Sequence, residues 1–185
     1  ESYYLNGNKL LESYRQADPE YSQQSFLRMR AQEEASPLYD YMNAHSNKRY
    51  YKYMKATPGS HSQFIMASAD RSYGIQRLND LQMKTGHKIE TLFRAGNIFD
   101  RYLAIVGHWN VNFKKLVHLT TASMLIAAKF EQPMSPNFEK LMTHLGQHER
   151  NLTTKRALLE MEKEIGEKFD WNFAFVGPAE FIDRY

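Results

Sequence analysis

Cysteine is absent from the 185 residues of this chain, which excludes disulfide bonds and thiolate metal sites. Low-complexity repeats and glycine-rich phosphate loops are absent as well. No apolar run provides the ~20 residues that a membrane-spanning helix needs, and no signal-peptide pattern is present. We therefore expect a soluble intracellular protein in a reducing compartment.

A strong excess of charge of one sign is also missing, since the formal net charge is only +3. Basic and acidic residues balance along most of the chain, which argues against a general nucleic-acid-binding protein. One basic aromatic run, KRYYKYMK at residues 48–55, has the composition of a patch that stacks on bases. We interpret it instead as a tyrosine-rich packing segment that its lysines keep soluble, because no other stretch extends the basic surface.

The sequence shows no recognisable active site. It contains no evident nucleophile beside a base and no carboxylate pair assignable to a cleft. His144 and His148 have the i, i+4 spacing of a zinc-binding helix, but Gly146 lies between them and no third ligand is evident. We expect no catalysis, no metal and no cofactor.

What the sequence does contain is one segment, FKKLVHLTTASMLIAAKFE at residues 113–131, that is apolar or small almost all the way round. A surface helix would show a charged face, and this segment shows none until Lys129. The pattern predicts a helix at the centre of an all-helical domain. Its charged end, at Lys129, Phe130 and Glu131, is the place where we expect function.

Hydrophobic periodicity on both sides of this segment predicts four more helices and no strands. The first covers about residues 62–83 and the second about residues 89–106. A short fourth helix starts near Ser135 and ends at Gly146, and a fifth follows cap-type residues and covers about residues 154–169. Five helices joined by short loops predict a compact all-α domain around the central third helix.

The remaining segments frame this domain, which we place at residues 62–176. Residues 1–35 form a polar arm that we expect to be ordered only against a partner or the main domain. The pair Ser36-Pro37 predicts the start of an N-terminal helix, which with its linker covers residues 36–61. Residues 177–185 begin a further helix, so we expect the native protein to continue into another domain.

The order of the motifs resembles the first cyclin box of the cyclin family, with the spacing of D-type and A/B-type cyclins. The resemblance covers the chain from about residue 70 to its end and rests on four pieces in the family's order. They are DRSYGIQRL (70–78), IETLFRAGNIFDRYL (89–103), TASMLIAAKFEQ (121–132) and TKRALLEMEKEIGEKFDWNFAFVGPAEFI (154–182).

The resemblance implies a five-helix cyclin box and a partner, a cyclin-dependent protein kinase. In the family, the residues that match Lys129 and Glu162 bind the mobile regulatory helix of the kinase, and apolar residues pack around them. It also implies that Arg71 and Asp100 pair inside the box and hold its first two helices in register. The partner-binding residues expected on this basis are Lys129, Glu162, Phe130, Ile126, Lys163, Trp171 and Phe173.

Both charged residues of the expected site also have an ordinary structural interpretation. A lysine such as Lys129 is favoured at any helix C-terminus by the helix dipole. Glu162 lies among charged residues that form a solvated face with i, i+4 pairs such as Glu164–Lys168.

Two departures from the family pattern change the expected function. Many cyclins recruit substrates through an apolar groove on the first helix, and we expect no binding of the usual Arg-x-Leu peptides here. On the fifth helix, Glu164 and Gly166 replace apolar residues, which predicts a weaker kinase interface. The positions that match the groove are Asp70, Tyr73, Gly74 and Arg77.

Three functional hypotheses follow, and the first is favoured. In the first hypothesis, the chain is a regulatory subunit that binds and activates a cyclin-dependent kinase. In the second, it is a cyclin-fold scaffold that does not activate a kinase and serves in a larger assembly. The third, a nucleic-acid-binding cyclin fold, lacks the basic face that phosphate binding requires.

Overall fold

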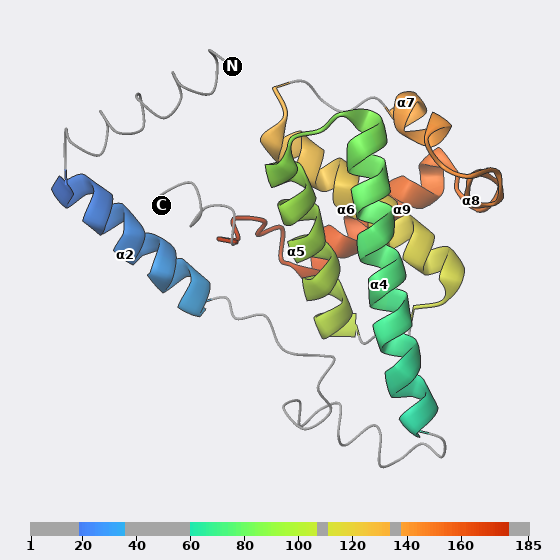
Figure 1. Ribbon diagram of the computed structural model, residues 1–185, viewed down its shortest axis with the longest axis horizontal. Coiled ribbons are helices and arrows are strands. Elements are labelled where there is room, and N and C mark those ends of the chain that lie inside the picture. The colour runs from blue at the N-terminus through green and yellow to red at the C-terminus, as the bar shows by residue number, and fades with distance from the viewer. Residues whose placement is uncertain (1–18, 36–59, 107–110, 134–137, 178–185) are drawn as a thin grey trace.

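The computed structural model describes residues 19–35, 60–106, 111–133 and 138–177. Within these ranges the chain forms helices and no strand, which confirms the predicted all-α class. Figure 1 shows α2 to one side and the other helices gathered in one bundle. The helices are α2 (Pro19–Ala35), α4 (Ser60–Thr85), α5 (Ile89–Val106), α6 (Phe113–Glu131), α7 (Phe138–Thr143), α8 (Gln147–Leu152) and α9 (Lys155–Lys168).

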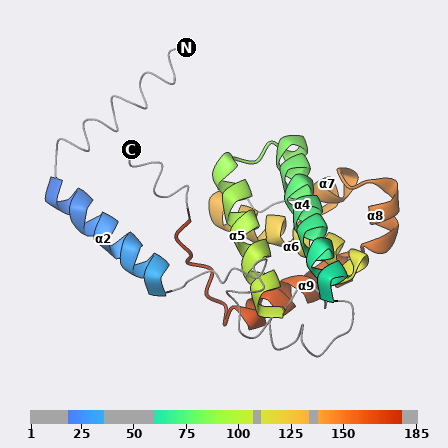
Figure 2. The same ribbon diagram turned by 60° about the horizontal axis from the view of Figure 1, so that its bottom comes forward.

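Helix α6 is the centre of the bundle, with the bounds that the sequence predicts (Figures 1 and 2). Every residue in the range 116–128 is buried, because α4, α5 and α9 all pack against this helix. Its first turn is capped by Asn112, whose side-chain oxygen accepts a hydrogen bond of 2.9 Å from the Lys115 amide. A helix that is covered on all sides has no solvent-exposed face for charged residues, which explains why its side chains are apolar or small.

Helices α4 and α5 form a close pair beside α6. Helix α4 is followed directly by Gly86, where φ is +69°, a conformation that glycine adopts without steric cost. The two helices are in close contact at Gly74, where an added Cβ would overlap the fully buried ring of Phe99. The glycine therefore sets the distance between the helices.

The segment after α6 differs from the prediction of one short helix that ends at Gly146. The described part of this segment forms two helices of six residues each, α7 and α8, and Gly146 begins the second of them. The Gly146 amide donates a 2.9 Å hydrogen bond to the Glu149 carboxylate, so the glycine starts a helix instead of stopping one. Thr154 caps α9 as predicted, accepting from the Ala157 amide at 3.1 Å.

Several predicted segments lie outside the described residues. They include the helix start at Ser36-Pro37, the basic aromatic run at residues 48–55, and the helix expected after Gly177. Within the polar arm, the described part is the helix α2. None of the described helices has the length and apolar character to cross a membrane.

Candidate functional site

The end of α6 meets the middle of α9 at a charged pair. The Lys129 ammonium contacts the Glu162 carboxylate at 2.6 Å. The lysine side chain is about half exposed, whereas that of Glu162 is only 14% exposed. The structure thus brings together two residues that are 33 positions apart in the sequence.

Aromatic side chains lie next to this pair. Phe130 is 57% exposed, and its ring centroid is 5.6 Å from that of the buried Phe173. Phe173 in turn packs edge-on against Phe169 at 5.6 Å. Trp171 is the most exposed of these aromatic residues, at 64%. An exposed ring thus rests on a buried aromatic layer.

Two expected site residues stand elsewhere. Ile126 is 6% exposed and belongs to the hydrophobic core, so it supports the surface from below. Lys163 extends into solvent with its side chain 71% exposed and faces Glu167 at 3.7 Å. Neither residue contributes apolar area next to the charged pair.

Leu159 is a surface residue that the sequence analysis missed. Its exposed fraction is 55%, and it lies three residues before Glu162 and seven before Gly166 on α9. Residues at these spacings share one face of a helix. The available signal was that Leu159 lies off the face formed by Leu158, Met161 and Ile165, which the periodicity assigns to the core. We call Lys129, Phe130, Leu159, Glu162 and Trp171 the docking surface.

Arg94 of α5 connects the docking surface to the rest of the bundle. Its guanidinium forms an ion pair with Glu131 and donates a 3.2 Å hydrogen bond to the backbone carbonyl of Phe173. It also lies 5.9 Å from the centroid of the Phe130 ring. No spacing pattern in the sequence indicates this contact, because its partners lie 37 and 79 residues away.

The sequence pattern placed Glu164 in the expected kinase interface, as a replacement for an apolar residue. In the structure Glu164 does not face the docking surface. Two residues along a helix correspond to a rotation of about 200°, so Glu164 points away from Glu162. Its carboxylate accepts a 2.5 Å hydrogen bond from the Tyr102 hydroxyl and one of 2.8 Å from the Lys115 ammonium. Glu164 therefore connects α9 to α5 and α6.

The environment of Glu164 shifts two pKa values in opposite directions. Burial acts to raise the pKa of Glu164, but the hydrogen bonds from Lys115 and Tyr102 outweigh it and hold the pKa below its ordinary value. Burial, and then the hydrogen bond to Glu164, raises the pKa of the Tyr102 hydroxyl. Tyr102 therefore remains a protonated donor and Glu164 an ionised acceptor at neutral pH.

Gly166 is covered by Trp171. Added to Gly166, a Cβ would lie 2.6–2.8 Å from three atoms of the Trp171 ring. The Trp171 amide donates a 2.8 Å hydrogen bond to the Gly166 carbonyl, and the Asp170 amide a 3.4 Å bond to the Glu167 carbonyl. This pair of bonds is the Schellman pattern that ends many helices. The missing side chain at Gly166 is the space that the indole occupies.

Arg71 and Asp100 join α4 to α5. The guanidinium donates two hydrogen bonds of 2.9 Å to the two carboxylate oxygens. This bidentate geometry fixes both direction and distance, which suits a contact that sets the register of two helices.

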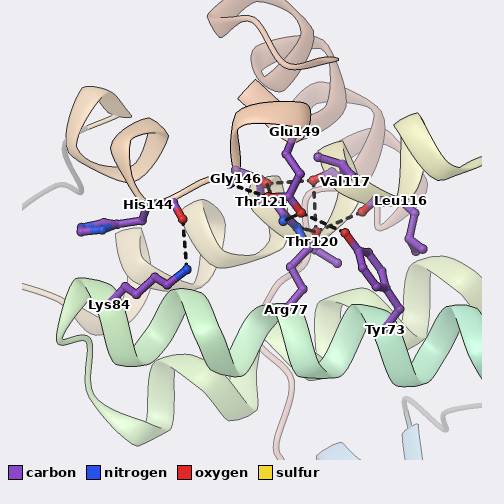
Figure 3. A network of polar contacts seen from close by, with 10 residues as sticks. All are labelled: Tyr73, Arg77, Lys84, Leu116, Val117, Thr120, Thr121, His144, Gly146 and Glu149. Atoms are coloured by element: carbon purple, nitrogen blue, oxygen red, sulfur yellow. Dashed lines mark hydrogen bonds and ion pairs between the residues drawn. The ribbon is translucent and has the colours of Figure 1, made fainter. Parts of the chain in front are cut away.

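Arg77 points into the bundle and not onto the expected substrate groove (Figure 3). Its guanidinium donates to the hydroxyls of Thr120 and Thr121 at 2.8 Å and 3.2 Å, and forms an ion pair with Glu149. The Tyr73 hydroxyl donates to the same carboxylate at 2.9 Å. The arginine thus joins α4, α6 and α8.

The two histidines with metal-like spacing do not form a metal site in the described structure. No group of three or more histidine, aspartate or glutamate side chains is placed to hold a metal ion among the described residues. The His148 ring instead packs against that of Phe113, with centroids 5.9 Å apart.

Comparison with known proteins gives one family. The family model described as "Cyclin, N-terminal domain" matches residues 28–174. No solved structure matches the chain.

Curated relatives agree with this match. Cyclin-B2-4 of Arabidopsis thaliana is 30% identical over 96 residues, which are 52% of this chain and 21% of that protein. G2/mitotic-specific cyclin-2 of Antirrhinum majus is 28% identical over 145 residues, 78% of this chain and 30% of that protein. G2/mitotic-specific cyclin-1 of Saccharomyces cerevisiae is 31% identical over 101 residues, 55% of this chain and 20% of that protein. The chain thus spans less than a third of the length of each of these relatives.

Proposed function

The chain belongs to the cyclin family through its N-terminal domain, and on this premise we propose that it is a regulatory subunit that binds and activates a cyclin-dependent protein kinase. In this proposal the subunit has no catalysis of its own. The observation that carries the proposal is the Lys129–Glu162 pair, which stands between exposed apolar side chains where α6 meets α9.

The chemistry of the docking surface suits the end of a helix in a partner protein. Exposed carbonyls of such a helix accept hydrogen bonds from the Lys129 ammonium, and exposed amides donate to the Glu162 carboxylate. The contact between the two side chains holds both charges in place before a partner arrives, which lowers the entropic cost of binding. Phe130, Leu159 and Trp171 exclude water around them.

Binding at this surface activates a kinase if it favours one position of the kinase's regulatory helix. Kinase chemistry requires a strand lysine paired with a glutamate on that helix. A subunit that binds only the inward helix position shifts the population toward the active state. Turning a mostly inactive population into a mostly active one takes ~5.5 kcal/mol of differential affinity. A few buried aromatic and charged contacts supply energies of this size.

A second function, a cyclin-fold scaffold that does not activate a kinase, is favoured by one observation. Arg77 is 7% exposed and engaged with Thr120, Thr121 and Glu149, so one of the four positions that match the substrate groove is committed to internal contacts. A chain with this arrangement still docks a partner through the end of α6.

Purification of the protein from its source cells tests the proposal. The complex is assayed for protein kinase activity, and the purification is repeated with Lys129→Ala plus Glu162→Ala. We expect the kinase and its activity to be lost from the double variant. The matched control is Arg156→Ala plus Glu160→Ala, which also removes one charge of each sign from an ion pair on α9, but from an exposed i, i+4 pair. The control should retain the kinase.

Two results would contradict kinase activation. A bound kinase that both double variants retain equally would show that the Lys129–Glu162 pair is not the docking site. A stable set of partners without protein kinase activity, unchanged in the Lys129/Glu162 variant, would support the scaffold instead.

A further inference from the structure

The turn that follows α9 holds its backbone in an unusual conformation. Asp170 and Trp171 have φ values of +51° and +57°. This left-handed region costs an L-residue roughly 1 kcal/mol or more, and a bulky residue such as tryptophan is rarely found there. Strained residues of this kind persist only where the surrounding contacts hold them.

The contacts that hold this turn are visible on both sides of it. Phe169 and Phe173 are both buried in the core cluster, so the chain is fixed just before and just after the strained residues. Between them, the amides of Asp170 and Trp171 bond back to α9. The Trp171 side chain is thereby directed onto the helix at Gly166.

A Schellman turn is commonly accompanied by an apolar contact between the second residue after the cap and the third residue before it. Here those residues are Trp171 and Gly166. Since Gly166 has no side chain, the contact is made by an indole lying on bare helix backbone. A side chain at residue 166 would take the same space, because even a Cβ would come within 2.8 Å of three ring atoms.

The position of Gly166 on α9 places this contact within the docking surface. Gly166 follows Glu162 by four residues and Leu159 by seven, so all three share one helical face. Trp171 supplies apolar area on that face where α9 has no side chain. The ring remains 64% exposed and can be covered by a partner.

We propose that Gly166 is a positioning residue for Trp171, and that the two act as one unit that presents the indole to an apolar helix face of the partner. This inference rests on the proposed function for the partner's identity, while the positioning itself is a property of the isolated chain. It replaces the prediction that the glycine weakens the interface. The glycine is the reason that a larger apolar group can lie there.

The positioning is tested first without a partner. Trp109→Phe leaves Trp171 as the only tryptophan of the chain, which contains two. In that background, Gly166→Ala should abolish the near-ultraviolet circular dichroism of Trp171, because the ring no longer lies on the helix. The thermal midpoint should not fall, since alanine is the better helix residue. An unchanged tryptophan signal in Gly166→Ala would overturn the proposal.

The second test is a double-mutant cycle on the affinity for the kinase that co-purifies with the wild-type chain. Gly166→Ala and Trp171→Ala should each weaken binding by roughly tenfold or more, as for a central aromatic contact. The double variant should be no weaker than Trp171→Ala, because the glycine acts only through the ring. Losses that add in the double variant would overturn the proposal.

The two tests separate the possible failures. If no kinase co-purifies, the proposed function fails, and the tryptophan signal still decides whether Gly166 positions Trp171. If a kinase binds and Trp171→Ala leaves its affinity unchanged, the proposed function stands and the inference about the indole fails.

Discussion

At the scale of single residues, the two glutamates Glu162 and Glu164 have different roles although only one residue separates them. Glu162 contacts Lys129 at the docking surface, whereas the partly exposed Glu164 binds Tyr102 of α5 and Lys115 of α6. Helix geometry separates the two, because two residues turn the chain by about 200°. A run of charged residues in a helix therefore does not form a single solvated face.

The lowered pKa of Glu164 predicts a dependence of stability on pH. A carboxylate with a depressed pKa stabilises the folded state above its unfolded pKa, and that contribution is lost as the pH falls through the folded pKa. We therefore expect Glu164→Gln to lower the free energy of unfolding at pH 7. The difference from wild type should shrink below a pH of about 4.5, the ordinary value for this group.

Urea unfolding of both proteins between pH 7 and pH 3 measures this effect. Glu160→Gln is the control, because the Glu160 side chain is 64% exposed and pairs with Arg156 on the surface of the same helix. A Glu164→Gln difference that stays constant over the whole pH range would contradict the prediction.

At the scale of helices, the distance between α4 and α5 depends on Gly74, for which the sequence had suggested a different role. Gly74 was assigned to the altered substrate groove, but the structure places it against the ring of Phe99. Gly96, on the opposing helix, has only the end of the Ile75 side chain near it, at 3.9 Å from an added Cβ. The two glycines thus form a matched pair with different surroundings.

The substitutions Gly74→Ala and Gly96→Ala should change stability in opposite directions. Gly74→Ala should lower the free energy of unfolding, because overpacking against the buried Phe99 costs about 1–3 kcal/mol. The higher helix propensity of alanine offsets this loss only in part. Gly96→Ala has space for its methyl group and should gain about 1 kcal/mol from helix propensity. Chemical denaturation of both variants measures the two signs. Equal effects would show that the close approach at Gly74 does not limit the packing.

Within the bundle, the longer helices could be predicted from the sequence and the shorter ones could not, and the 17-residue helix α2 was also missed, because its region was interpreted as a polar arm. The bounds of α5 and α6 follow from a sustained apolar pattern, and in α6 from a capping asparagine as well. Helices α7 and α8 have six residues each, too few for a periodic pattern, and their existence depends on packing. The role of Gly146 was ambiguous, because glycine is common both after the last residue of a helix and at the N-cap before the first.

The docking surface was predictable only in part, for a different reason. The resemblance to cyclins pointed to Lys129 and Glu162, which the structure places in contact. The position of Trp171 depends on two left-handed backbone conformations at non-glycine residues, for which the sequence carries no signal. A family pattern also cannot indicate that a ring from the following turn occupies the space of an absent side chain at Gly166.

At the scale of the whole molecule, one buried helix and the polar contacts around it position the docking surface. Lys129 lies at the end of α6, and Glu162 comes from α9, which packs against it. Arg77 holds α4 and α8 to the same helix through Thr120, Thr121 and Glu149. Substitutions far from the surface that disturb α6 will therefore also disturb the site.

The complete burial of α6 has a consequence for amide hydrogen exchange. Amides in the range 116–128 are shielded on all sides, so they should exchange only when the entire domain unfolds. The Trp171 amide bonds to Gly166 in a solvated turn and should exchange through local opening. A bound partner should therefore slow deuterium uptake strongly at residues 170–172 and at most slightly in α6, which mass spectrometry of the free and bound chain can measure. The docking surface would then combine the end of α6, which is rigid before binding, with the turn at Trp171, which becomes rigid when the partner binds.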